Sequence, residues 1–187
     1  MAAPTPILAA VYRGKSDELA TLLATQPTLT LFEAAALGDA TRVREIARAE
    51  PASLTGRSPD GWPALHLAAH FGHGDAVDAL LAVGADVRAL SDNHEANTAL
   101  HASLAGRKSV RVVSALLARG ADVNARGGGG YTPLHIATFE GDAALINTLL
   151  AHGAAADARA DDGKTALAIA EERGHAQAAR RLRGELP

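Results

Sequence analysis

Apolar residues between residues 132 and 153 follow the spacing of two short helices. The first helix is predicted to begin at Pro133, where proline needs no N–H partner, with Thr132 capping the free amides. Gly141 interrupts this helix, and a second apolar face follows. That face consists of Leu145, Ile146, Leu149 and Leu150. Gly153 is expected to end the second helix in the left-handed conformation, so the segment is predicted to be a helix pair.

The same pattern recurs along the chain at a nearly constant interval. The first-helix motif reads PALHLAA from residue 63, TALHASL from 98, TPLHIAT from 132 and TALAIAE from 165, at intervals of 35, 34 and 33 residues. The second-helix motifs end at the structural glycines Gly84, Gly120 and Gly153, and turn motifs such as DDGK at 161–164 precede the next pair. Because one helix pair cannot bury its own apolar face, we expect successive pairs to stack.

These motifs resemble the ankyrin repeat, which has a β-turn, two helices, a T-P-L-H-x-A signature and a period near 33. The segments DGWPALHLAAHFGHGDAVDALLAVGADV and GYTPLHIATFEGDAALINTLLAHGA carry all three motifs in order. The resemblance implies an all-α ankyrin-repeat solenoid of stacked antiparallel helix pairs with short β-turn fingers. It also implies that the chain works by binding another protein.

Degenerate copies extend the resemblance toward the N-terminus. TLFEAAALGDATRVREIARAEP aligns with the unit at residues 64–84 at an offset of 34, which places Phe32 at the histidine position of T-P-L-H. In the preceding copy, Gly14 lies only 24 residues before Gly38, so a full finger does not fit between the two. We therefore expect one domain over residues 1–187, with units at about 6–27, 28–51, 60–88, 95–124, 129–157 and 162–184.

Two loops depart from the repeat pattern. The segment from Ala89 to Thr98 is two residues longer than the equivalent segment from Ala125 to Thr132. Four glycines at residues 127–130 replace the usual Asp-x-x-Gly of a finger, which lowers the order expected of this turn. Two interpretations are open, namely sequence drift in a tolerant loop and a finger that adapts to a partner.

Composition and charge narrow the functional classes. The chain contains no cysteine, which excludes disulfides, cysteine-ligated zinc and thiol catalysis. A net charge of −3 without a basic stripe disfavours nucleic acid as a partner. No apolar run approaches the ~18 residues of a membrane span, and the N-terminal residues do not resemble a secretory signal. We therefore expect a cytoplasmic monomer that uses no cofactor, and abundant alanine and arginine suggest a GC-rich bacterial genome.

Three closely spaced histidines raise the alternative of a metal site. His66, His70 and His73 have metal-like spacing, which suggests a metal-binding protein or a metal-dependent hydrolase. The ankyrin resemblance instead implies a structural role for His66, His101 and His135, which occupy the histidine position of T-P-L-H. Such histidines form hydrogen bonds near the helix start and bridge to the next unit. His73 falls at a Gly-His loop position common in the family, so His70 is left unexplained.

Protein binding is the function that remains, because the chain has neither a G-x-S-x-G nor a Walker A motif. The resemblance implies that a partner contacts the finger tips and the concave ends of the first helices. The residues at those places are Trp62, His70, Phe71, Asp92, Asn93, His94, Arg126, Tyr131, Phe139, Glu140 and Lys164. The candidate anchors among them are the aromatic residues Trp62, Phe71, Tyr131 and Phe139. Alternatively, Trp62 and Tyr131 only pack on neighbouring fingers, and whether binding scaffolds or inhibits the partner is left open.

Overall fold

The computed structural model is helical and describes residues 3–25, 28–92, 96–106 and 109–185. The α-helices are α1 (Pro6–Arg13), α2 (Ser16–Thr25), α3 (Leu31–Leu37), α4 (Ala40–Ala49), α5 (Ala64–His70), α6 (Gly74–Ala82), α7 (Ala99–Ala105), α8 (Val110–Ala118), α9 (Pro133–Phe139), α10 (Ala143–Ala151), α11 (Ala166–Glu172) and α12 (Ala176–Leu182). Two 3₁₀ turns, η1 (Pro51–Thr55) and η2 (Gly128–Gly130), lie in connecting loops. Within the described ranges, β pairing is limited to one isolated bridge between Leu90 and Thr98. The all-α prediction is therefore confirmed.

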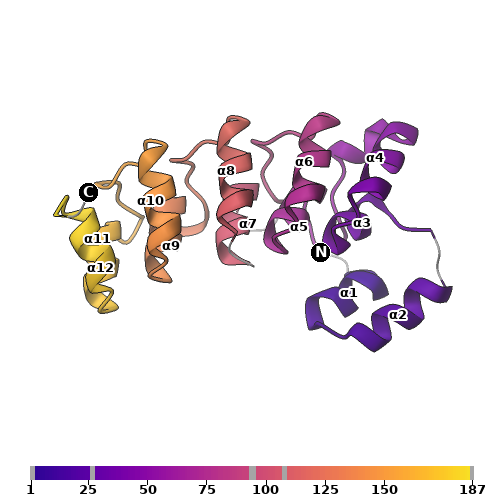
Figure 1. Ribbon diagram of the computed structural model, residues 1–187, viewed down its shortest axis with the longest axis horizontal. Coiled ribbons are helices and arrows are strands. Elements are labelled where there is room, and N and C mark those ends of the chain that lie inside the picture. The colour runs from indigo at the N-terminus through magenta and orange to yellow at the C-terminus, as the bar shows by residue number, and fades with distance from the viewer. Residues whose placement is uncertain (1–2, 26–27, 93–95, 107–108, 186–187) are drawn as a thin grey trace.

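Consecutive helices form pairs, which we number in chain order from α1/α2 as the first pair to α11/α12 as the sixth. From the second pair onward they stack in a row (Figure 1). The first helices α3, α5, α7, α9 and α11 pack on one another in one layer, and the second helices from α4 to α12 pack in another. This stack is the predicted solenoid. None of the helices in the described residues is long and apolar enough to cross a membrane.

The structural glycines end second helices through their backbone conformation. Gly84, Gly120 and Gly153 follow α6, α8 and α10 with φ angles of +96°, +87° and +87°. The next residue then donates its N–H to a helix carbonyl, as Ala154 does to Leu149 at 3.0 Å. A Cβ at any of the three glycines would meet no atom within 4 Å, so the positive φ alone favours glycine.

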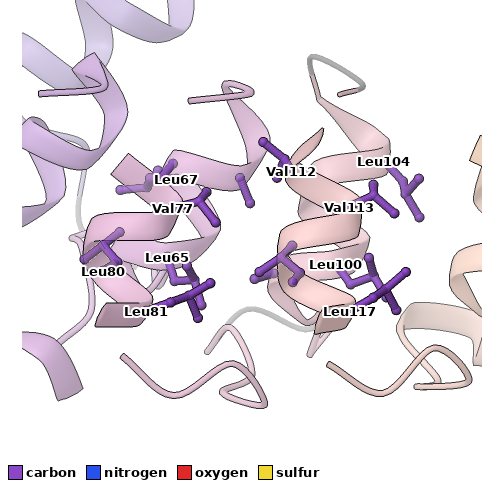
Figure 2. Packing of buried hydrophobic residues seen from close by; sticks show 14 of the residues in the cluster. Leu65, Leu67, Val77, Leu80, Leu81, Leu100, Leu104, Val112, Val113 and Leu117 are labelled. Atoms are coloured by element: carbon purple, nitrogen blue, oxygen red, sulfur yellow. The ribbon is translucent and has the colours of Figure 1, made fainter. Parts of the chain in front are cut away.

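The second helices from α4 to α10 each present three apolar residues in the same register, which we call the apolar triad. The triads of α4, α6, α8 and α10 are Val43/Ile46/Ala47, Val77/Leu80/Leu81, Val113/Leu116/Leu117 and Ile146/Leu149/Leu150. Figure 2 shows the α6 triad beside Leu65 and Leu67 of α5, within the shared core. Buried alanines of the first helices let the backbones approach closely and complete this packing.

The placement of Phe32 at the histidine position is wrong. Thr30 caps α3, and the third residue after it is Glu33, not Phe32. Glu33 is buried and fills the histidine position, where its Oε2 accepts the Thr30 N–H at 2.8 Å and its Oε1 accepts the Thr5 hydroxyl at 2.7 Å. The alignment failed because α3 has one residue fewer between its cap and Gly38 than α1, α5, α9 and α11 have between their caps and the next glycine of positive φ.

The first helix pair lies out of line with the row. Figure 1 shows α1 and α2 below the stack, near α3, instead of at its end. Ile7, Leu8 and Ala10 of α1 are buried, whereas α2 has no buried residue. The main packing partner of α2 is α1, and its contact with α4 is at most marginal. The layer of second helices is therefore interrupted between α2 and α4.

Candidate partner-binding surface

The finger tips form a row of turns joined by backbone hydrogen bonds. The turn at Ser58–Trp62 closes through a 2.9 Å hydrogen bond between its end residues, and the fingers before α9 and α11 close in the same way. Neighbouring fingers are linked because Asp92 N–H donates to Gly61 O and Asp161 N–H donates to Gly129 O, both at 2.9 Å. Finger residues far apart in sequence are thereby held side by side.

The glycine-rich finger is shaped by close contacts. Gly128 N–H donates to the Asn97 side-chain oxygen at 3.3 Å, an acceptor from the preceding finger. Gly130 has a φ of +70°, and the ion pair between Arg126 and Asp161, 2.6 Å long, passes directly over it. A Cβ at Gly130 would come within 2.3 Å of both side chains. Close packing therefore accounts for glycine at position 130, an explanation that neither of the two interpretations, loop drift and adaptation to a partner, had considered.

Buried histidines connect each central pair to the next. His66, His101 and His135 are each 1% exposed. Their Nε2 atoms lie 2.8, 3.1 and 3.1 Å from the carbonyl oxygens of Asn97, Tyr131 and Lys164, respectively. Because a carbonyl only accepts, Nε2 must carry the proton. Each acceptor immediately precedes the residue that caps the first helix of the following pair. We call this series of bonds the histidine ladder.

The hydrogen bonding of the other ring nitrogen, Nδ1, differs between His66 and the equivalent residues His101 and His135. Nδ1 of His101 and His135 accepts from the N–H and hydroxyl of the capping threonine, with hydroxyl distances of 2.7 and 2.8 Å. The cap before His66 is Pro63, which offers neither group, and the buried His66 Nδ1 has no hydrogen-bond partner among the residues that the structure describes. Burial lowers the pKa of His66 to about 4 and also lowers the pKa values of His101 and His135.

Aromatic rings gather on the ends of the first helices near the N-terminus. The half-buried Trp62 packs edge-on against His70, with ring centroids 5.4 Å apart, and His70 packs edge-on against Phe71 at 5.0 Å. Tyr12 lies over Phe71 at 5.7 Å and donates its hydroxyl to Asp60 at 2.6 Å. Burial, followed by this hydrogen bond, raises the pKa of Tyr12. Tyr12 therefore covers part of a predicted anchor.

The equivalent surface of the fifth and sixth pairs is more open. Phe139 is 45% exposed, and the Arg173 guanidinium stacks over its ring at 3.1 Å. Tyr131 is half-buried, and its hydroxyl donates to Asp162 at 2.9 Å. Lys164 pairs with Glu172 at 2.6 Å. Phe139 thus remains accessible on one side while its neighbour fixes its orientation.

The remaining predicted residues are polar and sit along the same row. Asp92 is exposed, and its carboxylate lies 3.4 Å from the Arg57 guanidinium. Glu140, also exposed, follows Phe139 at the end of α9. Asn93 and His94 lie outside the described residues. Of the predicted set, the structure brings Trp62, His70 and Phe71 together and places Tyr131 and Phe139 farther along.

Comparison with known families explains this architecture. A family model described as ankyrin repeats (3 copies) matches the chain twice, at residues 31–127 and 112–185. The chain belongs to the ankyrin-repeat family. Ankyrin repeats are generally protein–protein interaction modules. No curated protein matches this ankyrin-repeat chain.

The three histidines that suggested a metal site point to different places in this ankyrin-repeat protein. His66 Nε2 bonds to Asn97 O in the fourth pair, and His73 Nε2 bonds to Ala36 O in the second pair at 3.0 Å. His70 lies among aromatic rings. In the part of the chain that the structure describes, no three His, Cys, Asp or Glu side chains are grouped to hold a metal ion.

Contacts in the structure extend the candidate surface to Tyr12, Asp60 and Arg173. Tyr12 and Asp60 join the first and third pairs, and Arg173 stacks on Phe139. The repeat pattern itself puts Tyr12 and Arg173 at the concave ends of first helices, since Tyr12 stands two residues before Gly14 as Phe139 stands two residues before Gly141, whereas Asp60 was not expected. The partners of Tyr12 had no such signal, because the repeat pattern relates neighbouring pairs and this contact skips one.

Proposed function

We propose that this ankyrin-repeat chain is a non-catalytic protein that binds a partner protein through its finger tips and the concave ends of its first helices. The proposed contact residues are Trp62, His70, Phe71, Asp92, Asn93, His94, Arg126, Tyr131, Phe139, Glu140 and Lys164. The aromatic members are the anchors, because large rigid rings at an interface contribute most of the binding free energy.

The exposure of Phe139 is the observation that carries this proposal. A phenylalanine in a small protein is normally buried, yet Phe139 keeps 45% of its surface exposed on the candidate face. Its orientation is fixed by Arg173, so little side-chain entropy is lost when a partner covers it. Tyr12, at the matching place in α1, is 39% exposed.

Capture of the partner from the native lysate tests the proposal. We expect Phe139→Ala to reduce recovery of a specific partner about tenfold or more, the effect of losing an interface anchor. Val110→Ala is the matched control, because Val110 is 42% exposed but lies at the start of a second helix, α8. Recovery should decline further in the variant with alanine at Trp62, Phe71, Tyr131 and Phe139, provided that its circular dichroism is unchanged. Equal recovery of every protein by all variants contradicts the proposed surface.

The same proposal treats the chain as one domain of six units with the predicted boundaries, which the stacking of the second to sixth pairs and the contact of α1 with α3 support. The monomeric state and cytoplasmic location remain predictions. Size-exclusion chromatography with light scattering checks the first of these, with a mass near 19.1 kDa expected.

A further inference from the structure

The leucines of α2 have the register of an apolar triad but lack its burial. Leu19, Leu22 and Leu23 precede the members of the α4 triad by 24 residues each, the same offset that separates Gly14 from Gly38. All three leucines are partly exposed, whereas every triad residue of the stack except Ile46 and Leu150 is buried. The sequence of α2 thus suits a place in the layer of second helices that α2 does not occupy.

The place it would occupy is an open groove with an apolar floor and a polar rim. The groove has a volume of about 490 Å³ and lies between α3 and α4. Its apolar lining is Leu29, Leu31, Phe32, Ile46 and Ala49, and its charged lining is Arg42, Glu45 and Glu50. The corresponding faces of α6, α8 and α10 are covered by the preceding second helix. At α4, this cover is missing because α2 lies below the row (Figure 1).

The observed position of the first pair is held mainly by α1, in which Ile7, Leu8 and Ala10 are buried and which packs on α3, whereas α2 has no buried residue. Tyr12 bonds to Asp60 and lies on Phe71, and the Thr5 hydroxyl bonds to Glu33. Five residues, 26–30, separate α2 from α3, compared with fourteen between α4 and α5. A link of five residues is too short for a finger like those between the central pairs.

Chain length permits α2 to reach the groove. Five residues span up to about 17 Å, and packed helices lie about 8–10 Å apart. Movement of α2 onto α4 therefore requires no unfolding of α3. The leucines have the spacing of one helix face, so a single rotation of the first pair brings all three toward the groove.

We propose that the first helix pair has two positions, the observed one in which Tyr12 covers Phe71 and a second one in which Leu19, Leu22 and Leu23 fill the groove between α3 and α4. The observed position is autoinhibitory, because it shields an anchor of the partner surface. Binding of a partner at Phe71 displaces Tyr12 and favours the second position. This inference rests on the proposed function only in assigning Phe71 to the partner surface.

Cross-linking of paired cysteines tests the second position without any partner. The chain has no cysteine of its own, so an introduced pair reacts alone. The test pair is Ala24→Cys with Arg48→Cys, and the control pair is Arg48→Cys with Ala82→Cys. All three positions are exposed and each directly follows the last residue of its triad or, for Ala24, Leu23. A short bis-maleimide that reaches about 10 Å, the spacing of packed helices, links neighbouring positions only.

Two substitutions should change the rate of the test pair in opposite directions. Tyr12→Ala removes the contacts with Phe71 and Asp60 and should speed cross-linking about fivefold, the population change expected from losing one ordinary hydrogen bond. Ala49→Glu places a charge in the groove at an exposed position and should slow the test pair about fivefold. The control pair should react equally fast in every background, which also verifies that the stack is intact.

Two results overturn the proposal. One is a test-pair rate that neither Tyr12→Ala nor Ala49→Glu alters. The other is cross-linking between chains that increases with protein concentration, which means that a second copy occupies the groove. Because the readout involves no partner, either result leaves the proposed binding function intact, and a failed partner capture leaves the two positions of the first pair intact.

Discussion

The third helix pair and the two pairs after it share the histidine bond to the next pair but differ in the bond between that histidine and its helix cap. In all three, a buried histidine donates from Nε2 to the next pair. His101 and His135 also accept from a capping threonine, whereas His66 follows Pro63 and its Nδ1 has no hydrogen-bond partner within the described ranges. The comparison shows that the bond from Nε2 to the next pair and the bond from the helix cap to Nδ1 can exist independently in one side chain. His66 forms the first bond without the second.

Acidification should have the largest effect, because it places a positive charge on three buried imidazoles and turns the Nδ1 acceptors of His101 and His135 into donors. Burial lowers the pKa of His66 to about 4 and lowers those of His101 and His135, so the unfolded chain binds protons more readily. Stability is therefore present above the unfolded pKa of about 6.5 and is lost as the pH falls toward 4. His66 alone should cost about 3 kcal/mol at pH 4.

Urea denaturation between pH 7 and pH 4 measures this loss. The control is His66→Leu, whose free energy of unfolding should depend less on pH across the same window. A wild-type profile that is flat between pH 6.5 and 4, or that His66→Leu leaves unchanged, contradicts the assignment of a neutral buried imidazole.

Replacing the histidines one at a time tests at neutral pH whether the capping bond contributes to stability. His101→Leu leaves the Thr98 cap and the Tyr131 carbonyl without their partner and should cost about 3 kcal/mol. His66→Leu strands only the Asn97 carbonyl and also removes an unsatisfied nitrogen, so it should cost about 1–2 kcal/mol less. Urea midpoints of the two variants at pH 7 give the difference, and equal losses would show that the capping bond at His101 contributes nothing.

Restoring the missing cap should have the smallest effect and sharpen the comparison. Pro63→Thr provides a hydroxyl and an N–H for His66 Nδ1 at a position whose backbone is already extended. The expected gain is about 1 kcal/mol, or about 3 °C in Tm. The matched reverse change is Thr98→Pro, which should cost a similar amount. Calorimetry of both variants checks the prediction, and a destabilising Pro63→Thr would contradict it.

Periodic motifs made much of the fold predictable. Thr132-Pro133 and the glycine after each central second helix specify local backbone conformations, so the helix pairs of residues 60–157 follow from short stretches of sequence. The degenerate second pair was harder. Phe32 was assigned to the histidine position because Gly38 anchored the alignment, and a one-residue deletion inside α3 shifts that position to Glu33. The sequence did contain a signal for this shift, because Thr30 and Glu33 have the T-x-x-E spacing of a capping box.

The position of the first pair was not predictable from repeats. Its motifs have the regular order, and its leucines have the regular spacing, yet Tyr12 reaches past the second pair to Asp60, 48 residues away. Such a contact joins pairs that are not neighbours in sequence, and the repeat period carries no information about it. The contacts within the candidate surface were not predictable for the same reason, since periodicity identifies where aromatic rings lie but not which rings cover one another.

The histidine ladder gives the array a direction. Each imidazole needs an acceptor in the pair that follows, and each pair offers that acceptor just before its own first helix. The sixth pair takes the bond from His135 but carries Ala168 at the ladder position, where its N–H only meets the capping Thr165. A duplicated pair inserted before the sixth would thus receive and pass on the connection, whereas one appended after it would receive none. Growth of this array by duplication is chemically easiest from within.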